Sequence, residues 1–144
     1  MDRRALLAFV PALLAATAAQ ASGGGEKKKD SAGQYVDLAP IALPVVVGGK
    51  LINYIFVALR LNLTPSADSV KLRAKEPWFR DAMVRAGHRQ PFTNPKNYLT
   101  LDEARLKSVL LREAGAIAGP KNFTSVTITS MTPKQRSGLP RPPA

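Results

Sequence analysis

The residues that could carry out chemistry in this sequence are few. His88 is the only histidine, and the chain has no cysteine, so neither a histidine cluster nor a thiolate site can hold a metal ion. No serine lies in the Gly-x-Ser-x-Gly context of a nucleophile elbow. Gly23-Gly24-Gly25 follows no predicted strand, which argues against a phosphate-binding loop. We interpret His88 as a solvated residue at a helix C-terminus.

Acidic side chains are the other candidates for catalysis. The expected folded region contains no Asp-x-Asp or Glu-x-x-His pattern among its carboxylates, which are Asp37, Asp68, Glu76, Asp81, Asp102, Glu103 and Glu113. Spatial pairs need not be neighbours in sequence, so paired-carboxylate catalysis stays open as a third hypothesis that no positive feature supports. We expect a protein without catalytic activity, metal or cofactor.

Trp78 and Arg80 are the residues that we single out for partner binding. Trp78 is the only tryptophan and lies next to Phe79 at the start of a predicted helix. The favoured interpretation of Trp78 is packing in the core, because aromatic residues at a helix start usually become buried. The alternative is an exposed anchor for a partner protein.

The N-terminus has the layout of a cleavable signal peptide over residues 1–21. Arg3 and Arg4 form a basic region, and residues 5–19 form an apolar run. Ala19 and Ala21 fit the small-x-small pattern of a signal peptidase site, which predicts cleavage before Ser22. The protein is then exported to the bacterial periplasm.

Two alternatives remain for this segment. Residues 5–19 could be retained as an inner-membrane anchor with the domain in the periplasm, although the run is shorter than a membrane span needs and contains Pro11. Arg3-Arg4 is also a partial twin-arginine signal, which an ordinary basic region explains equally well.

Composition divides the remaining chain into three parts. Residues 22–34 are rich in Gly, Lys and Ser and predict a flexible tether. Residues 35–133 are long enough for one domain, and residues 134–144 predict a disordered tail rich in Pro and Arg. The formal charge of +11 favours anionic partners. Nucleic acid is not expected, because the protein is exported and its basic residues are not interleaved with aromatics.

Two strands joined by a turn open the expected domain. Residues 35–47 alternate in hydropathy and change phase near Pro40. Pro40 and Pro44 cannot donate hydrogen bonds in a sheet, which predicts an edge or bulged strand. Gly48-Gly49 predicts a hairpin turn, and residues 50–63 predict a central strand that is covered on both faces over part of its length. The expected buried face of the first strand consists of Val36, Leu38, Ile41, Leu43 and Val45.

Helices follow the two strands. Thr64 as N-cap, with Pro65 after it, predicts a charged helix over residues 65–75. Pro77 ends or kinks that helix. A second helical stretch covers residues 77–88.

The last part of the domain predicts a helix and a strand. Thr100 and Glu103 form a capping box that opens an amphipathic helix over residues 101–118. Residues 122–131 alternate as a closing strand. The predicted class is α+β, in the order β-β-α-α-β, with helices packed on a sheet.

Five stretches in this order resemble one family. They are Tyr35–Ile41, Leu51–Leu63, Glu76–Met83, Leu101–Gly119 and Val126–Thr129. Together they make residues 35–133 similar to the periplasmic domain of the flagellar basal body-associated protein FliL family. Arg80-Asp81-Ala82 is the closest local match, since the helix of that family contains a segment of Ile-Arg-Asp-Ala-Leu type.

The resemblance implies a stomatin-like fold, homo-oligomerisation and association with the stator units around the flagellar motor. Members usually have one N-terminal transmembrane helix, whereas the apolar segment of this chain looks cleavable. We expect a non-catalytic basal-body-associated protein that supports motility from the periplasmic side. The alternative is a soluble envelope-binding module that uses its basic surface on anionic lipid or cell-wall polymer.

The signal-peptide interpretation predicts the mature N-terminus. If residues 1–21 are removed during export, the first residue of the mature protein is Ser22. Intact-mass measurement of the protein purified from the periplasm checks this. A mass that includes residues 1–21 would show that the segment is retained.

Overall fold

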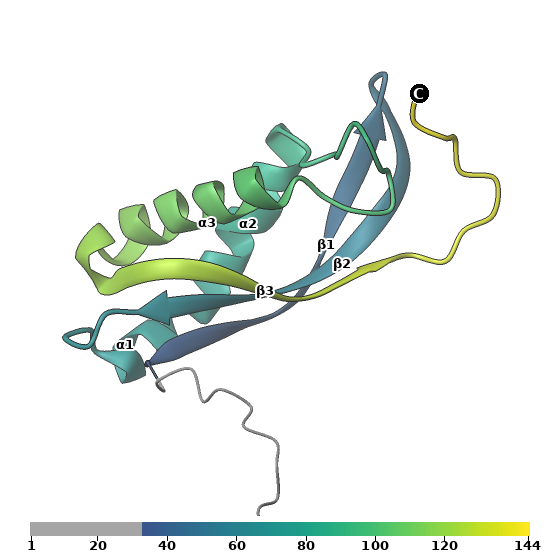
Figure 1. Cartoon of the computed structure of the whole chain (residues 1–144). Helices are drawn as coiled ribbons and strands as arrows, with labels where there is room; N and C mark the ends of the chain where they lie inside the picture. Colours follow the sequence, from purple (N-terminus) through teal and green to yellow (C-terminus); the bar gives the residue numbers. More distant parts are fainter. Residues whose placement is uncertain (1–32) are drawn as a thin grey trace, which may run out of the picture.

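The computed structural model of this chain describes residues 33–144. The described residues do not include the predicted cleavage site at Ala19, Ala21 and Ser22. They also exclude most of the predicted tether. The described residues form a three-stranded antiparallel sheet with helices packed on one face (Figure 1), which confirms the α+β class. The order is β-β-α-α-α-β, with one helix more than the predicted β-β-α-α-β. The elements are β1 (Tyr35–Val47), β2 (Lys50–Leu63), α1 (Ser69–Ala74), α2 (Glu76–Arg89), α3 (Glu103–Ala118), a short 3-10 turn (Pro120–Asn122) and β3 (Phe123–Pro133).

β1 and β2 form the predicted hairpin. Gly48 and Gly49 have φ of 57° and 74°, which suits glycine in a tight turn. The register shifts between Leu38 and Ile41, so a bulge at Pro40 produces the expected change of phase. The five residues predicted for the inner face are all buried, namely Val36, Leu38, Ile41, Leu43 and Val45.

β2 lies between β1 and β3, which confirms that it is the central strand. The prediction that both of its faces are covered is wrong. α2 packs on β1 and α3 packs on β3 over the same face of the sheet (Figure 1), so within residues 33–144 no helix or strand covers the opposite face. Phe56, which points to that open face, is 44% exposed. Apolar residues on both faces of β2 are therefore not sufficient evidence that another layer packs on each face.

The first helix starts later than predicted. α1 begins at Ser69, and its N-cap is Asp68, whose carboxylate accepts a hydrogen bond from the Lys71 amide at 3.1 Å. That hydrogen bond lowers the pKa of Asp68. Thr64 is not the cap; its hydroxyl donates to the Lys121 carbonyl at 3.1 Å and ties the end of β2 to the start of β3.

The predicted capping box of the last helix is also wrong. α3 begins at Glu103, and Asp102 is its N-cap, with the carboxylate accepting from the Arg105 amide at 3.2 Å. Thr100 instead donates its hydroxyl to the Asn97 carbonyl within the preceding loop. Asp102 is held at this point because its own amide donates to the Phe92 carbonyl at 2.8 Å.

α2 follows α1 directly and is anchored by one aromatic contact. Lys75 ends α1 and precedes α2, and Pro77 lies in the first turn of α2, where a missing amide proton costs nothing. Phe79 is fully buried and meets Phe123 of β3 edge to face, with ring centroids 5.7 Å apart. The end of the helix expected near Pro77 is thus the junction between α1 and α2.

The loop between α2 and α3 covers the far part of the hairpin, beyond the helices (Figure 1). The Thr93 hydroxyl bonds both the amide and the carbonyl of Val46, at 2.9 and 3.0 Å. Phe92 and Leu101 are buried beneath this loop. The loop therefore extends the layer that the helices form on this face of the sheet, although the loop itself is not helical.

The segment after β3 has neither helix nor strand, but it stays close to β2 at its start. The Lys134 amide donates to the Tyr54 carbonyl at 2.9 Å, and Arg136 donates to the Ile52 carbonyl at 2.9 Å. Asn53 is 1% exposed and donates to the Lys134 carbonyl at 3.2 Å. Disorder over residues 134–144 as a whole stays a prediction.

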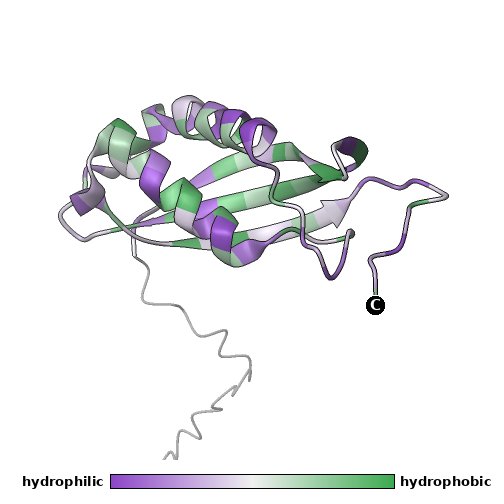
Figure 2. Cartoon of the chain, turned by 90° about the horizontal axis from the view of Figure 1, so that it is seen from above, coloured by the Kyte–Doolittle hydropathy of each residue, from purple (hydrophilic) through white to green (hydrophobic). Residues whose placement is uncertain are grey.

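Hydropathy follows the same layering. Figure 2 shows hydrophobic colour along the strands and a mixture of hydrophobic and hydrophilic colour on the helices. α3 buries Leu106, Leu110 and Ala114 on the face towards the sheet, at the spacing expected of an amphipathic helix. The helices therefore keep their charged residues on the outer surface.

The contact of Phe79 with Phe123 leads to a stability prediction with a neighbouring control. Phe79→Ala lowers the free energy of unfolding by about 3 to 5 kcal/mol, because it removes a large side chain from a packed core. Trp78→Ala changes that free energy by less than about 0.5 kcal/mol, because Trp78 is exposed. Urea denaturation followed by circular dichroism measures both. Equal losses in the two variants would contradict this packing.

Candidate partner-binding surface

The two residues singled out for partner binding lie on different sides of α2. Residues two apart on a helix point in roughly opposite directions. Trp78 is 60% exposed, so its predicted burial in the core is wrong, and Phe79 takes that place. The structure therefore does not bring Trp78 and Arg80 together, and each belongs to a separate part of the surface.

Arg80 lies beside the outer edge of β1. Its Nε is 3.5 Å from Glu76 Oε1, and the same carboxylate oxygen accepts from the Ala39 amide at 3.0 Å. A shallow, open hollow lies here, lined by Pro40, Ile41, Ala42, Pro77, Arg80, Asp81 and Val84. Arg80 thus supports Glu76, which in turn fixes the bulge of β1 to α2.

Trp78 lies on the side of α2 that faces α3. Arg85 and Arg89 follow it at positions seven and eleven residues later, and this spacing puts all three on one helical stripe. The rise of an α-helix sets Trp78 and Arg89 about 16 Å apart along the axis. Arg85 is paired with Asp81 at 2.9 Å. The stripe ends at a groove between the two helices.

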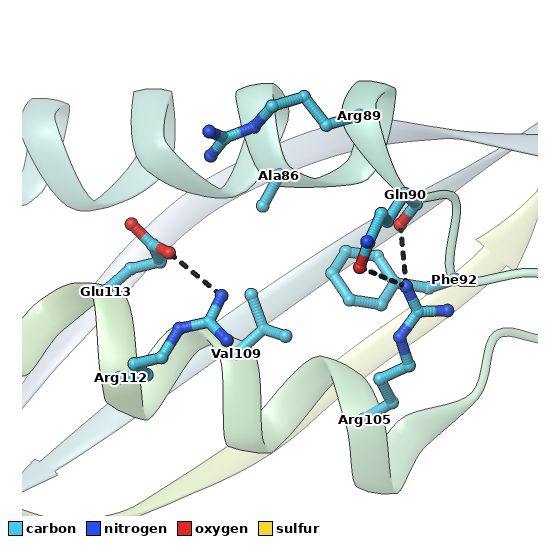
Figure 3. Close-up of a pocket in the computed structure, with 8 residues that line it drawn as sticks. All are labelled: Ala86, Arg89, Gln90, Phe92, Arg105, Val109, Arg112 and Glu113. Carbon is cyan, nitrogen blue, oxygen red and sulfur yellow. Dashed lines mark hydrogen bonds and ion pairs between the residues drawn. The ribbon is translucent and has the colours of Figure 1, made fainter.

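The groove, called here the α2–α3 groove, has a volume of about 320 Å³ (Figure 3). Ala86, Phe92 and Val109 provide apolar surface within it, and arginines from both helices rise around them. An apolar floor with a charged rim is typical of a site for a side chain or short segment of a partner. Its lining residues are Ala86, Arg89, Gln90, Phe92, Arg105, Val109, Arg112 and Glu113.

Arg105 is held in place by the end of α2. Its guanidinium donates to the Pro91 carbonyl at 3.1 Å, to the Gln90 carbonyl at 3.3 Å and to Gln90 Oε1 at 3.2 Å. It also lies over the Phe92 ring, 5.4 Å from the centroid, within cation–π range. These contacts fix the guanidinium before any ligand arrives, so little conformational entropy is lost on binding.

The rest of the rim carries a net positive charge. Arg112 Nη2 is 3.1 Å from Glu113 Oε1, and Figure 3 shows this pair on the α3 side. Arg89 has no hydrogen-bond or ion-pair partner among the described residues. Three arginines against one glutamate favour an anionic ligand.

A second cluster of charges lies on the open face of the sheet. Arg60 forms two hydrogen bonds to Asp37, at 2.6 and 3.0 Å, and its guanidinium lies 3.8 Å from the centroid of Tyr35. The hydrogen bond to Asp37 raises the pKa of Arg60. Because these groups satisfy each other, we interpret the cluster as a cross-strand support between β1 and β2.

The histidine and the carboxylates considered as candidates for catalysis or metal binding do not form a cluster. Nδ1 of His88 lies 2.8 Å from the Val84 carbonyl in its own helix. Within residues 33–144, no three His, Asp or Glu side chains gather in a way that could hold a metal ion. In that same range, no helix is both long and apolar enough to cross a membrane.

Sequence reasoning missed the α2–α3 groove. The signal was present as a stripe of Trp78, Arg85 and Arg89 in one helix and of Arg105, Val109 and Arg112 in the next. Each stripe could be found from helical periodicity. That the two stripes face each other depends on the packing of α2 against α3, which no local pattern reveals.

No family model matches this chain, and no curated protein matches it. The α2–α3 groove must therefore be interpreted from its own residues.

Proposed function

We propose that this chain is a non-catalytic periplasmic protein that supports the stator units of a flagellar motor. In this proposal the domain has a stomatin-like fold and forms homo-oligomers, as the resemblance to the FliL family implies. Its task is binding, and the α2–α3 groove with Trp78 is the surface that contacts a stator or basal-body protein.

The order and position of the elements support this proposal. Each stretch that resembles the family coincides largely with an element, since Tyr35–Ile41 lies in β1, Leu51–Leu63 in β2 and Glu76–Met83 in α2. The two later stretches lie at α3 and in β3. In the closest local match Arg80 and Asp81 are at the surface and Ala82 is buried. The matching residues thus include both buried and surface positions.

The observation that carries the binding role is the exposed Trp78. A tryptophan that is 60% exposed on a helix fixed by Phe79 and Met83 is unusual for a surface without a partner, and tryptophan is enriched among the residues that dominate binding energy at interfaces. The α2–α3 groove then supplies positive charge about 16 Å away along the same helix. An acidic segment of a stator protein could contact both.

Motility tests this function. We expect Trp78→Ala combined with Arg89→Ala to reduce swimming in soft agar almost as much as deletion of the gene, with normal growth. The reason is that both changes remove binding surface while the core stays intact. Swimming diameter and growth rate are measured in the bacterium that encodes the chain.

The matched control combines Val70→Ala with Lys96→Ala. Val70 is 74% exposed and Lys96 is exposed in the loop after α2, so this variant also loses one exposed apolar and one exposed basic side chain, away from the groove. It should swim normally. Normal motility of the deletion strain under high viscous load would contradict the proposed function, whatever the variants do.

A second candidate function is favoured by the charge of the α2–α3 groove. Five of the carboxylates in residues 33–144 are already paired with basic side chains, Glu113 with Arg112 among them, and Arg89 has no such partner in that range. A soluble envelope-binding module could use Arg89 and Arg112 on anionic lipid headgroups or cell-wall polymer. The two functions differ in the chemistry of the partner.

Vesicle binding tests the second candidate. Each basic residue near an anionic membrane contributes about 1 kcal/mol, so Arg89→Ala with Arg112→Ala should weaken binding to phosphatidylglycerol vesicles about thirtyfold. Binding should also fall as salt rises, because these charges are exposed. Arg80→Ala with Arg85→Ala is the control, since both arginines lie outside the groove. Salt-insensitive binding, or equal loss in the control, would contradict this function.

A further inference from the structure

The two edges of the sheet differ in their availability for pairing with another strand. The outer edge of β1 is blocked. Pro40 and Pro44 lack amide protons. Three further backbone positions bond to side chains outside the sheet: the Tyr35 carbonyl accepts from Arg73 Nε at 3.4 Å, the Ala39 amide donates to Glu76 Oε1 at 3.0 Å, and the Val46 amide donates to Thr93 Oγ1 at 2.9 Å. Another strand cannot pair here without displacing these groups.

The outer edge of β3 is open. Among the described residues, no backbone group of Thr124–Thr132 forms a hydrogen bond to anything except its neighbour β2. α3 packs on β3, and every threonine and serine of Thr124–Thr132 stays exposed. Unpaired backbone amides and carbonyls in a row are a template for another strand.

The part of β3 before Pro133 also lacks the residues that usually protect an edge. Thr124–Thr132 contains no proline and no charged residue, and consists of Thr, Ser, Val, Ile and Met. Threonine, valine and isoleucine favour extended backbone. In Figure 2 the arrowhead end of β3 is pale, as expected for residues of intermediate hydropathy. An edge this long without a lysine or proline is suited to pairing.

Basic residues flank this uncharged stretch on both sides. Lys121 lies just before β3, and Lys134 lies just after it; both are exposed. In an antiparallel pair of two copies, Lys121 of one copy would meet Lys134 of the other, and in a parallel pair each lysine would meet its own equivalent. Like charges opposite each other destabilise a strand pair. A second copy is therefore a poor occupant of this edge.

We infer that the outer edge of β3 binds a β-strand of a partner protein that is uncharged in the middle and acidic at its ends. The backbone groups of Thr124–Thr132 supply the affinity by strand addition. Lys121 and Lys134 select the acidic ends and fix the register. This site lies away from the α2–α3 groove, so it does not depend on the function proposed above.

α3 offers an apolar contact above the same edge. Leu111 is 36% exposed, and helical periodicity places it with Lys107 on the flank of α3 that is turned away from Arg105 and Arg112. An added strand would bring side chains of its inner face towards Leu111. The site thus combines backbone pairing, one apolar contact and two terminal charges.

Synthetic peptides test this site in the intact mature chain. One peptide alternates valine and threonine over about nine residues, a typical strand length, and has two aspartates at each end. The second replaces the aspartates with lysines. We expect the aspartate peptide to slow hydrogen exchange of amides in Thr124–Thr132 and to bind about tenfold tighter than the lysine peptide, as two weak ion pairs allow.

A charge reversal makes the test specific. Lys121→Glu with Lys134→Glu should reverse the preference, so that the lysine peptide binds more tightly. Lys50→Glu with Lys96→Glu changes two other exposed lysines and should leave the preference unchanged. Heteronuclear NMR titration measures affinity and exchange in every variant, and because all four lysines are exposed the fold is expected to be kept.

Two results would overturn the inference. The first is the absence of any protection at Thr124–Thr132 with either peptide. The second is protection of the same amides without peptide, together with a doubled mass in sedimentation, because a second copy would then occupy the edge.

Discussion

The edge-to-face contact of Phe79 with Phe123 connects two parts of the molecule that are distant in sequence. Phe79 belongs to the helix that packs on β1, and Phe123 begins β3 at the opposite edge of the sheet. The contact therefore fixes α2 relative to β3 as well as to β1. Because α3 packs on both α2 and β3, this aromatic pair is one of the contacts that set the width of the α2–α3 groove.

One covered face and one open face explain much of the remaining surface. Three helices and a loop bury the inner sides of the strands, and nothing in residues 33–144 covers the other side (Figure 1). The open face therefore keeps its own supports, such as the Arg60–Asp37 pair. α2 likewise leaves Trp78 and Arg89 exposed, because the inner side of the helix already provides its stability.

The sequence was most informative where one physical cause dominates. The hairpin followed from Gly48-Gly49, and the bulge from Pro40, since these residues restrict the backbone directly. The alternation of β1 correctly predicted its buried side chains. These features are local, and neighbouring elements have little influence on them.

Prediction from the sequence was less successful where two residues could each cap the same helix. It was also less successful where the result depends on contacts between elements that are distant in sequence. Thr64 and Asp68 are both acceptable helix caps, as are Thr100 and Asp102, and tertiary contacts decide between them: Thr64 bonds to the Lys121 carbonyl, and the Asp102 amide bonds to the Phe92 carbonyl. Trp78 and Phe79 are equally apolar by type, and only the direction of α2 buries one and exposes the other. The groove required the packing of two helices, which no local pattern contains.

The position of β3 in the chain has a consequence for folding. β1 and β2 are adjacent in sequence and can pair by local contacts, whereas β3 joins β2 only after α1, α2 and α3 have been made. Loop closure over that distance is slow compared with formation of a hairpin. Until β3 docks, the residues of β2 from Ile55 to Leu63 lack their pairing partners in β3. The strand that leaves an open edge in the finished protein is thus the one that closes a more hydrophobic edge during folding, and delayed docking of β3 is the step at which this chain is most exposed to aggregation.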